Sequence, residues 1–116
     1  MTEPKQSPIF SKTYDFLLWL LNHTEKFPKS ERFRLARRIE DSIFTFHDTL
    51  AQATRTRTPQ RLLLEADTEL DRLRLYVRLS HGRGLLQDNQ YRYAAEQLTE
   101  MGKLLGGWLK TVAKPG

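Results

Sequence analysis

Residues 25–39 read E-K-F-P-K-S-E-R-F-R-L-A-R-R-I, and this stretch decides the fold because it contains the end of one helix and the start of another. Pro28 disfavours helical geometry in the residue before it, so the preceding helix is predicted to stop there. Ser30 is a residue type that caps helix N-termini. The apolar residues that follow recur every three positions, at Phe33, Ala36 and Ile39. The stretch therefore predicts a helix with one face on a core and arginines on the other.

Similar spacing extends on both sides of this stretch. Apolar residues separated by three and four positions predict four helices, over residues 11–26, 30–53, 59–82 and 88–112. The third has Thr58 as its expected N-cap before Pro59, and Gly82 is expected to take the left-handed position after its last turn. No stretch alternates with the period of two that strands require. Four helices joined by short breaks predict an all-α fold, an up-down-up-down antiparallel four-helix bundle.

Length and composition indicate one globular domain. The chain has 116 residues, of which 39% are hydrophobic and 28% charged. The bundle is expected over residues 11–112, with flexible segments at 1–10 and 113–116. No cysteine is present, so disulfides and thiolate metal sites are excluded. The longest apolar run, residues 16–21, is far shorter than the roughly 20 residues of a membrane span, and a cytoplasmic location is expected.

The first predicted helix carries more apolar surface than one side of a bundle needs. One apolar stripe is expected to face the core: Phe10, Tyr14, Leu17, Leu18 and Leu21. The opposite side holds Phe16, Trp19 and Leu20. A helix that is apolar all round is buried all round, so a second copy of the chain or another protein is expected to cover these three residues. The alternative is that a wide stripe simply packs within the bundle.

A row of small side chains follows the apolar stripe of the last predicted helix: Ala95, Thr99, Gly102 and Gly106. Such a row permits the close approach of a partner helix, so it is assigned to the same oligomer interface. The alternative is a loosened C-terminal end, because each glycine of the pair 106–107 costs roughly 1 kcal/mol relative to alanine in a helix interior.

The sequence offers no pattern typical of catalysis or of a cofactor. His23, His47 and His81 fall on three separate predicted helices, and none has a second histidine at the i, i+4 spacing of a helical zinc site. The G-R-G sequence at 82–84 lacks the frame of a phosphate-binding loop. The sequence therefore predicts no metal, no cofactor and no enzymatic activity.

Positive charge is the chemical feature that remains. Lysines and arginines number 19 against 14 acids, for a formal charge of +5, and 12 of the 19 are arginines, whose planar fork binds phosphate or carboxylate with two hydrogen bonds. Two groups have few acids near them in the sequence: Lys26, Lys29, Arg32, Arg34, Arg37 and Arg38, and then Arg55, Arg57 and Arg61.

These two groups are expected to make a basic surface along the length of the bundle, for which a phosphate backbone is the natural complement. The aromatic residues are assigned to apolar stripes or helix ends, so no exposed platform for stacking bases is predicted. Arg72, Arg74 and Arg78 follow acids at pairing distance, as in Glu69 with Arg72, and internal pairing competes there with ligand binding.

Four blocks of sequence, taken in order, resemble one family. They are Y-D-x-x-x-W-L at 14–20, the stretch 25–39, L-x-x-A-x-x-E-L-D-x-L-R at 63–74 and L-G-G-W-L-K at 105–110. The order of these blocks is similar to that of the accessory variability determinant (Avd) family of diversity-generating retroelements. Four-helix proteins encoded by intervening sequences in large ribosomal RNA genes are similar as well.

The resemblance implies a non-catalytic homopentamer of four-helix bundles with a charged central channel. It also implies association with the reverse transcriptase of the element and with its template RNA or complementary DNA, in support of mutagenic copying. The residues carried over as phosphate or polymerase contacts are Lys26, Lys29, Arg32, Arg34, Arg37, Arg38, Arg72, Arg74 and Arg78, to which charge alone adds Arg55, Arg57 and Arg61. The alternative function is a helical interaction module that binds an acidic protein without nucleic acid.

Overall fold

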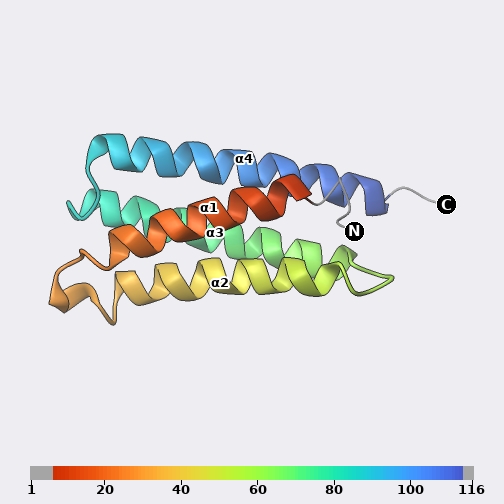
Figure 1. Cartoon of the computed structure of the whole chain (residues 1–116), viewed down its shortest axis with the longest axis horizontal. Helices are drawn as coiled ribbons and strands as arrows, with labels where there is room; N and C mark the ends of the chain where they lie inside the picture. Colours follow the sequence, from red (N-terminus) through yellow and green to blue (C-terminus); the bar gives the residue numbers. More distant parts are fainter. Residues whose placement is uncertain (1–6, 114–116) are drawn as a thin grey trace.

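The computed structural model describes residues 7–113. Its elements are α1 (Ser7–Thr24), the short 3₁₀ helix η1 (Lys29–Glu31), α2 (Leu35–Ala53), α3 (Gln60–Gly82) and α4 (Asp88–Ala113). Successive helices run in opposite directions along one long axis, so the connections α1–α2 and α3–α4 lie at one end and α2–α3 at the other (Figure 1). The predicted all-α antiparallel four-helix bundle is confirmed.

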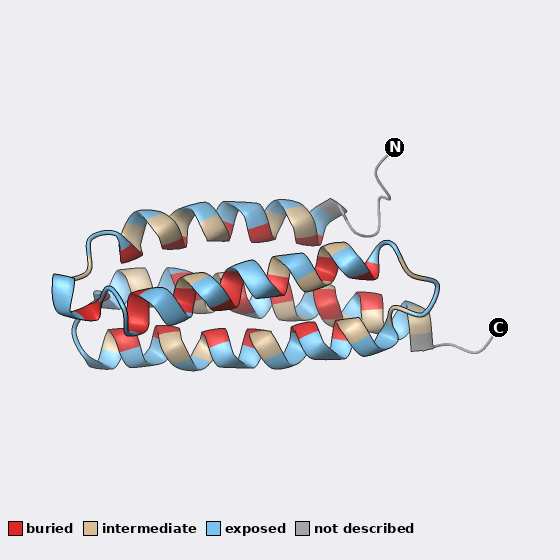
Figure 2. Ribbon diagram, turned by 90° about the horizontal axis from the view of Figure 1, so that it is seen from below, coloured by how far each residue is buried: buried red, intermediate tan, exposed pale blue. Residues whose placement is uncertain are grey.

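The core follows the predicted spacing in the last three helices. Buried residues line the inward faces of the helices, and exposed residues cover the outside (Figure 2). Ile39, Ile43, Phe46 and Leu50 of α2 pack with Leu63, Ala66, Leu70, Leu73 and Val77 of α3 and with Ala94, Leu98, Met101, Leu105 and Trp108 of α4. Each large side chain in this set contributes roughly 1.5–3 kcal/mol by leaving water.

Helix α1 is turned about its axis relative to the prediction, although Phe10 and Leu17 of the predicted stripe still pack, half-buried, against the core. Its fully buried positions are spaced by four and three: Ile9, Thr13, Phe16, Leu20 and Thr24. Tyr14, which was assigned to the core, is 64% exposed, and Leu18 is exposed as well. Phe16 and Leu20 are thus part of the chain's own core, so their assignment to an oligomer interface is wrong. The prediction failed because Thr13 and Thr24 are polar residues at buried positions, so the buried face of α1 does not show as an apolar repeat in the sequence.

Trp19 takes an intermediate place at the edge of α1. Its ring stacks on His23 with centroids 3.9 Å apart and lies 5.0 Å from the ring of Tyr93 in α4. Trp19 is half-buried by these contacts within the chain. Its predicted role in an oligomer interface stays a prediction.

Helix α2 starts later than predicted. The helix begins at Leu35 and not at Ser30, because residues 29–31 form η1 and Arg34 breaks the helical path with φ −116° and ψ −105°. Phe33 therefore lies in a turn and is 73% exposed instead of packing in the core. The side chain of Glu31, 2% exposed, is buried in this turn and holds it in place.

The other boundaries differ by a few residues. Pro59 is the N-cap residue of α3, and the backbone N–H of Thr58 donates to Thr56 Oγ1 at 3.2 Å instead of Thr58 capping the helix. Gly82 is helical, and Gly84 is the residue with positive φ, at 80°. Residues 7–10, predicted to be flexible, are helical. The flexible segments predicted at 1–6 and 114–116 lie outside the described residues. None of the described helices is long and apolar enough to span a membrane.

Candidate nucleic-acid interface

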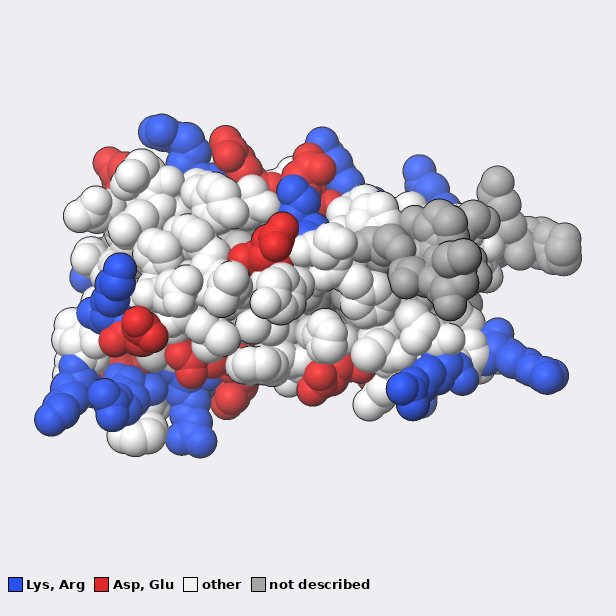
Figure 3. Space-filling view, in the orientation of Figure 1, with Lys and Arg blue, Asp and Glu red and all other residues white. Residues whose placement is uncertain are grey.

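Nine of the twelve predicted basic residues gather at the two ends of α2, and the other three lie within α3. Lys26, Lys29 and Arg32 lie in the α1–α2 connection, just before Arg34, Arg37 and Arg38, and all six are exposed. Arg55 and Arg57 lie in the α2–α3 connection at the other end, with Arg61 in the first turn of α3. Acidic side chains separate the two groups along the lower edge of the molecule, where α2 runs (Figure 3). On this face the basic surface is divided. The prediction of a continuous basic surface along the length of the bundle is therefore not met on this face (Figure 3).

A groove lies between the start of α2 and the end of α3, with a volume of about 550 Å³. We call it the α2–α3 groove, and the residues that line it are Phe33, Arg34, Leu35, Arg38, Tyr76, Leu79 and Arg83. Three of the seven are arginines and none is acidic. The volume is within the range of about 300–1,000 Å³ that small ligands occupy in proteins.

Glu31 organises the arginines at one side of this groove. Arg83 Nη2 donates to Glu31 Oε2 at 3.1 Å, and Arg34 Nε lies 3.8 Å from Glu31 Oε1. Glu31 Oε1 is buried and receives no hydrogen bond from the described residues. A buried carboxylate is costly without cations near it, so Glu31 holds the guanidinium group of Arg83 by a hydrogen bond and attracts that of Arg34 to the mouth of the groove.

Two arginines of α2 lie over aromatic rings. The Cζ atom of Arg37 is 5.7 Å from the centroid of the Phe33 ring, and that of Arg38 is 5.9 Å from the centroid of the Tyr76 ring. Both distances are within the limit of about 6 Å for cation–π attraction. Aromatic rings and arginines therefore interleave on this surface, which corrects the expectation that the aromatic residues are confined to apolar stripes and helix ends.

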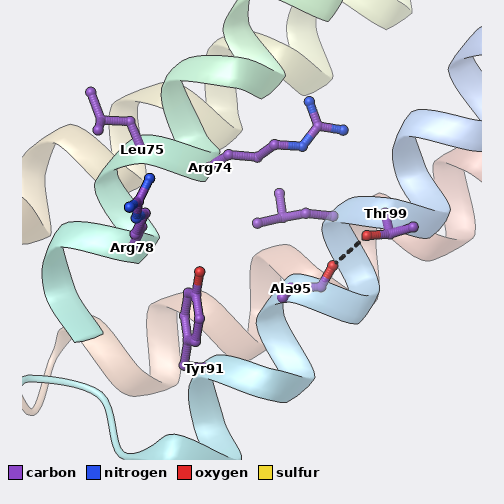
Figure 4. Close-up of a pocket in the computed structure, with 7 residues that line it drawn as sticks. Arg74, Leu75, Arg78, Tyr91, Ala95 and Thr99 are labelled. Atoms are coloured by element: carbon purple, nitrogen blue, oxygen red, sulfur yellow. Dashed lines mark hydrogen bonds between the residues drawn. The ribbon is translucent and has the colours of Figure 1, made fainter. Parts of the chain in front are cut away.

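A second groove, the α3–α4 groove, is lined by Arg74, Leu75, Arg78, Tyr91, Ala95, Leu98 and Thr99 and has a volume of about 350 Å³. Arg74 of α3 and Tyr91 of α4 extend into the space between the two helices, and Arg78 lies beside them on α3 (Figure 4). This groove brings together two sets of residues that the sequence treated separately: arginines assigned to ligand binding, and Ala95 and Thr99 from the row of small side chains.

Gly102 does not leave space for a partner helix. A Cβ atom placed on Gly102 would lie 2.6 Å from Arg74 Nη2, so the guanidinium group of the same chain already fills this position. A Cβ atom placed on Gly106, one turn further along α4, would have no neighbouring atom within 4 Å. The row of small side chains is thus occupied by Arg74 at Gly102 and open at Gly106, and its role in an oligomer interface stays a prediction.

Several predicted arginines are engaged in ion pairs. Arg72 Nη1 donates to Glu69 Oε1 at 2.8 Å, as expected from their spacing, and Arg74 Nη1 donates to Asp71 Oδ1 at 2.6 Å. Looser pairs join Arg37 to Asp41 at 3.9 Å and Arg61 to Glu65 at 4.0 Å. Within residues 7–113, seven predicted cations make no ion pair: Lys26, Lys29, Arg32, Arg38, Arg55, Arg57 and Arg78.

Arg83 is the residue of this site that sequence reasoning missed. It follows Gly82 in a segment interpreted as a turn between helices, and its partner Glu31 is 52 positions away. One signal in the sequence points to it. Glu31 is the single acid among six cations between positions 26 and 38, and its burial requires a cation from elsewhere in the fold.

The histidines are separate and belong to local contacts. His23 Nδ1 lies 2.8 Å from the carbonyl oxygen of Trp19, and His47 Nδ1 lies 3.2 Å from Asp48 Oδ1. His81 stacks on Tyr91 and is hydrogen-bonded to Asp88 Oδ1 at 2.7 Å. The His81 hydrogen bond, together with its charge, lowers the pKa of the Asp88 carboxyl. The described part of the chain contains no cluster of three or more side chains suited to hold a metal ion.

Comparisons with known proteins agree with this architecture. A family model described as bAvd-like matches residues 8–112. A crystal structure of a protein of unknown function from the S23 ribosomal protein family of Bacteroides thetaiotaomicron superposes with a TM-score of 0.83 at 18% sequence identity, over 91% of this chain and 98% of that one. At this identity the superposition supports the fold alone. No curated protein matches the chain.

Proposed function

This chain belongs to the bAvd-like family, and on that premise we propose that it serves a diversity-generating retroelement as an accessory protein that binds template RNA or complementary DNA and the reverse transcriptase. The observation that carries the proposal is the set of exposed cations at the start of α2, which lies within the matched residues 8–112. Its role is binding, in support of a polymerase that performs the chemistry.

The nucleic-acid part of the proposal rests on charge that the fold leaves free. Lys26, Lys29 and Arg32 are exposed and make no ion pair with the described residues. Each phosphate that such a cation neutralises releases condensed counterions, so binding is tolerant of sequence and falls steeply as salt rises. We expect Arg34, Arg37 and Arg38 to extend this contact, with Arg55, Arg57 and Arg61 at the far end and Arg72, Arg74 and Arg78 on α3 as the further predicted contacts.

The assembly is proposed to be a homopentamer, as the family resemblance implies. Tyr14 and Leu18 on α1 and Leu64 on α3 leave apolar surface exposed on the single chain. Neighbouring copies would cover such surface, and five copies would multiply the formal charge of +5 into a strong field for nucleic acid. Light scattering after size exclusion tests this directly. Five chains of 13.7 kDa give about 68.5 kDa, and a monomer mass contradicts the pentamer.

Two binding experiments test the ligands. We expect a single-stranded RNA of 20 nucleotides to bind with an affinity whose logarithm falls linearly with the logarithm of salt concentration, with a slope of about −0.7 for each phosphate contacted. An affinity independent of salt contradicts the electrostatic contact. We also expect the protein to capture the reverse transcriptase encoded in the same element.

The capture is repeated after nuclease treatment to separate the two partners. Capture that persists supports a direct protein contact, and capture that is lost indicates that RNA bridges the two proteins. Capture of the polymerase without any RNA binding by this protein favours the second candidate function, a module for an acidic protein surface. The exposed Leu75 and Leu79 beside the arginines of α3 are the observation behind that candidate.

A further inference from the structure

We propose that the α2–α3 groove binds a single-stranded segment of nucleic acid, with one base stacked on Phe33 and the adjoining phosphates held by Arg34, Arg38 and Arg83. This inference rests on the proposed function and deepens it. It assigns a specific site, and a preference for unpaired bases, to a protein whose remaining cations contact only the phosphate backbone.

Phe33 supplies the surface on which a base can stack. Phe33 is 73% exposed in the turn between η1 and α2. Leu35, two residues later, is buried and begins the helix. Nothing in the core requires an aromatic side chain at this position. An exposed aromatic ring beside a cationic groove is the feature on which successive bases stack in proteins that bind single strands.

The α2–α3 groove is positively charged. Its lining includes three arginines and no acid, and Glu31, which contacts Arg34 and Arg83, is buried. Because Glu31 holds two of these guanidinium groups from inside, their other donors remain directed at solvent. Phosphate groups are the ligands that match such a planar fork of donors.

Arginines and aromatic rings lie against one another at the groove. Arg37 lies over the Phe33 ring and Arg38 over the Tyr76 ring, so the groove presents guanidinium planes and ring faces side by side. Every base has a π face, and a base can stack on either surface. In a duplex these faces are covered by neighbouring base pairs, so only an unpaired base can use the groove.

The test compares Phe33→Ala with Phe44→Ala. Phe44 is a second exposed phenylalanine, on α2, 44% exposed, and no arginine of the described chain lies over its ring. Fluorescence anisotropy measures the affinity of each variant for a labelled 12-nucleotide single-stranded RNA and for the 12-base-pair duplex of the same sequence. Size exclusion with light scattering, and thermal unfolding, check that each variant keeps its mass and fold.

We expect Phe33→Ala to weaken single-strand binding by about 5- to 150-fold, the loss of one stacked base, and to change duplex binding by less than about twofold. Phe44→Ala should leave both affinities near those of the wild type. Phe33→Tyr should keep single-strand affinity because it keeps the ring, whereas Phe33→Leu should lose it although the side chain stays apolar.

Four results overturn the inference. Single-strand affinity that Phe33→Ala leaves intact removes the stacked base. Equal losses on single strand and duplex assign Phe33 to the assembly or the fold, and intact RNA binding with lost polymerase capture assigns it to a protein contact. Wild-type protein that binds neither RNA contradicts the proposed function itself, and the inference with it.

Discussion

The two ends of α2 are both basic, but they are built differently. At its start, Arg34 and Arg83 are held by the buried Glu31, and Arg37 and Arg38 lie over aromatic rings. At its end, Arg55 and Arg57 make no ion pair with the described residues. The start has guanidinium groups that contact a buried carboxylate or an aromatic ring around a groove, whereas Arg55 and Arg57 at the end have no ion-pair or aromatic partner among the described residues.

This difference separates two things that positive charge can do. Mobile cations attract a polyanion over a distance of about a Debye length, and salt screens that attraction. Fixed cations beside an aromatic ring also select the shape of what binds, because the cost of ordering them is already met in the free protein. The number of arginines at each end is therefore a poor guide to where a ligand is recognised.

The largest expected effect comes from reversing three charges at each end in turn. Arg34→Glu/Arg37→Glu/Arg38→Glu should lower affinity for single-stranded RNA by about 100-fold or more near 0.1 M salt, and reduce the salt slope by about 2, since each lost single-strand contact removes about 0.7. Arg55→Glu/Arg57→Glu/Arg61→Glu makes the same change in net charge and should cost less than about tenfold. Filter binding across a salt series measures both.

Each set of substitutions is the matched control for the other. Equal losses in the two triple variants would mean that only net charge matters, and the distinction between the two ends would be abandoned. Circular dichroism of both variants is needed beside the binding data, because Arg37 also faces Asp41 at 3.9 Å and its reversal places two acids on one helix face.

The sequence predicted the helices well because their spacing is redundant. Leu63, Ala66, Leu70, Leu73 and Val77 repeat one period over four turns, so no single residue decides the result, and all five are buried. The same reasoning failed on α1, where apolar residues occur on every side. There the buried face was set by packing against α2 and α4, and Thr13 and Thr24 on that face carried no apolar signal.

The basic segment at the start of α2 was predictable, but its groove was not. Local charge identified Lys26 to Arg38 as a unit because few acids interrupt it. The groove needs Tyr76, Leu79 and Arg83 from α3 and the following turn, and the position of Phe33 depends on a helix that starts five residues later than its sequence suggests. Those features follow from the burial of Glu31, which is a property of the folded chain and not of any local pattern.

A second prediction tests whether Glu31 and Arg83 hold the groove end together. Arg83→Ala should lower the free energy of unfolding by about 1–3 kcal/mol, because it removes the hydrogen-bonded cation from a buried carboxylate. The guanidinium group is itself 51% exposed, so the cost arises from Glu31 and not from burial of Arg83. Arg57→Ala, at the other end, should change stability by less than about 0.5 kcal/mol. Urea unfolding measures both.

The charge of Glu31 can be removed to check the cause. In the Arg83→Ala background, Glu31→Gln should restore much of the lost stability, since a neutral amide needs no cation beside it. Equal stability of Arg83→Ala and Arg57→Ala would indicate that Glu31 is satisfied without Arg83, and the two ends would then be alike in this respect.

The smallest expected effect concerns pH and again belongs to the groove end. The hydrogen bond from His81 lowers the pKa of Asp88 at the start of α4, so the folded state holds this proton less tightly than the unfolded chain does. The stabilisation is complete above the ordinary pKa of an aspartate and is lost as the pH falls through the lowered value. Asp88→Asn removes it while keeping a side chain of nearly the same size.

The wild type should melt about 1–2 °C above Asp88→Asn near neutral pH, and this difference should disappear towards pH 2. Asp67→Asn is the control, because Asp67 is exposed on α3 and makes no ion pair among residues 7–113. The difference in melting temperature between Asp67→Asn and the wild type should stay the same as the pH is lowered. A difference between wild type and Asp88→Asn that persists at pH 2 would show that the contact of Asp88 with His81 does not depend on the carboxylate charge.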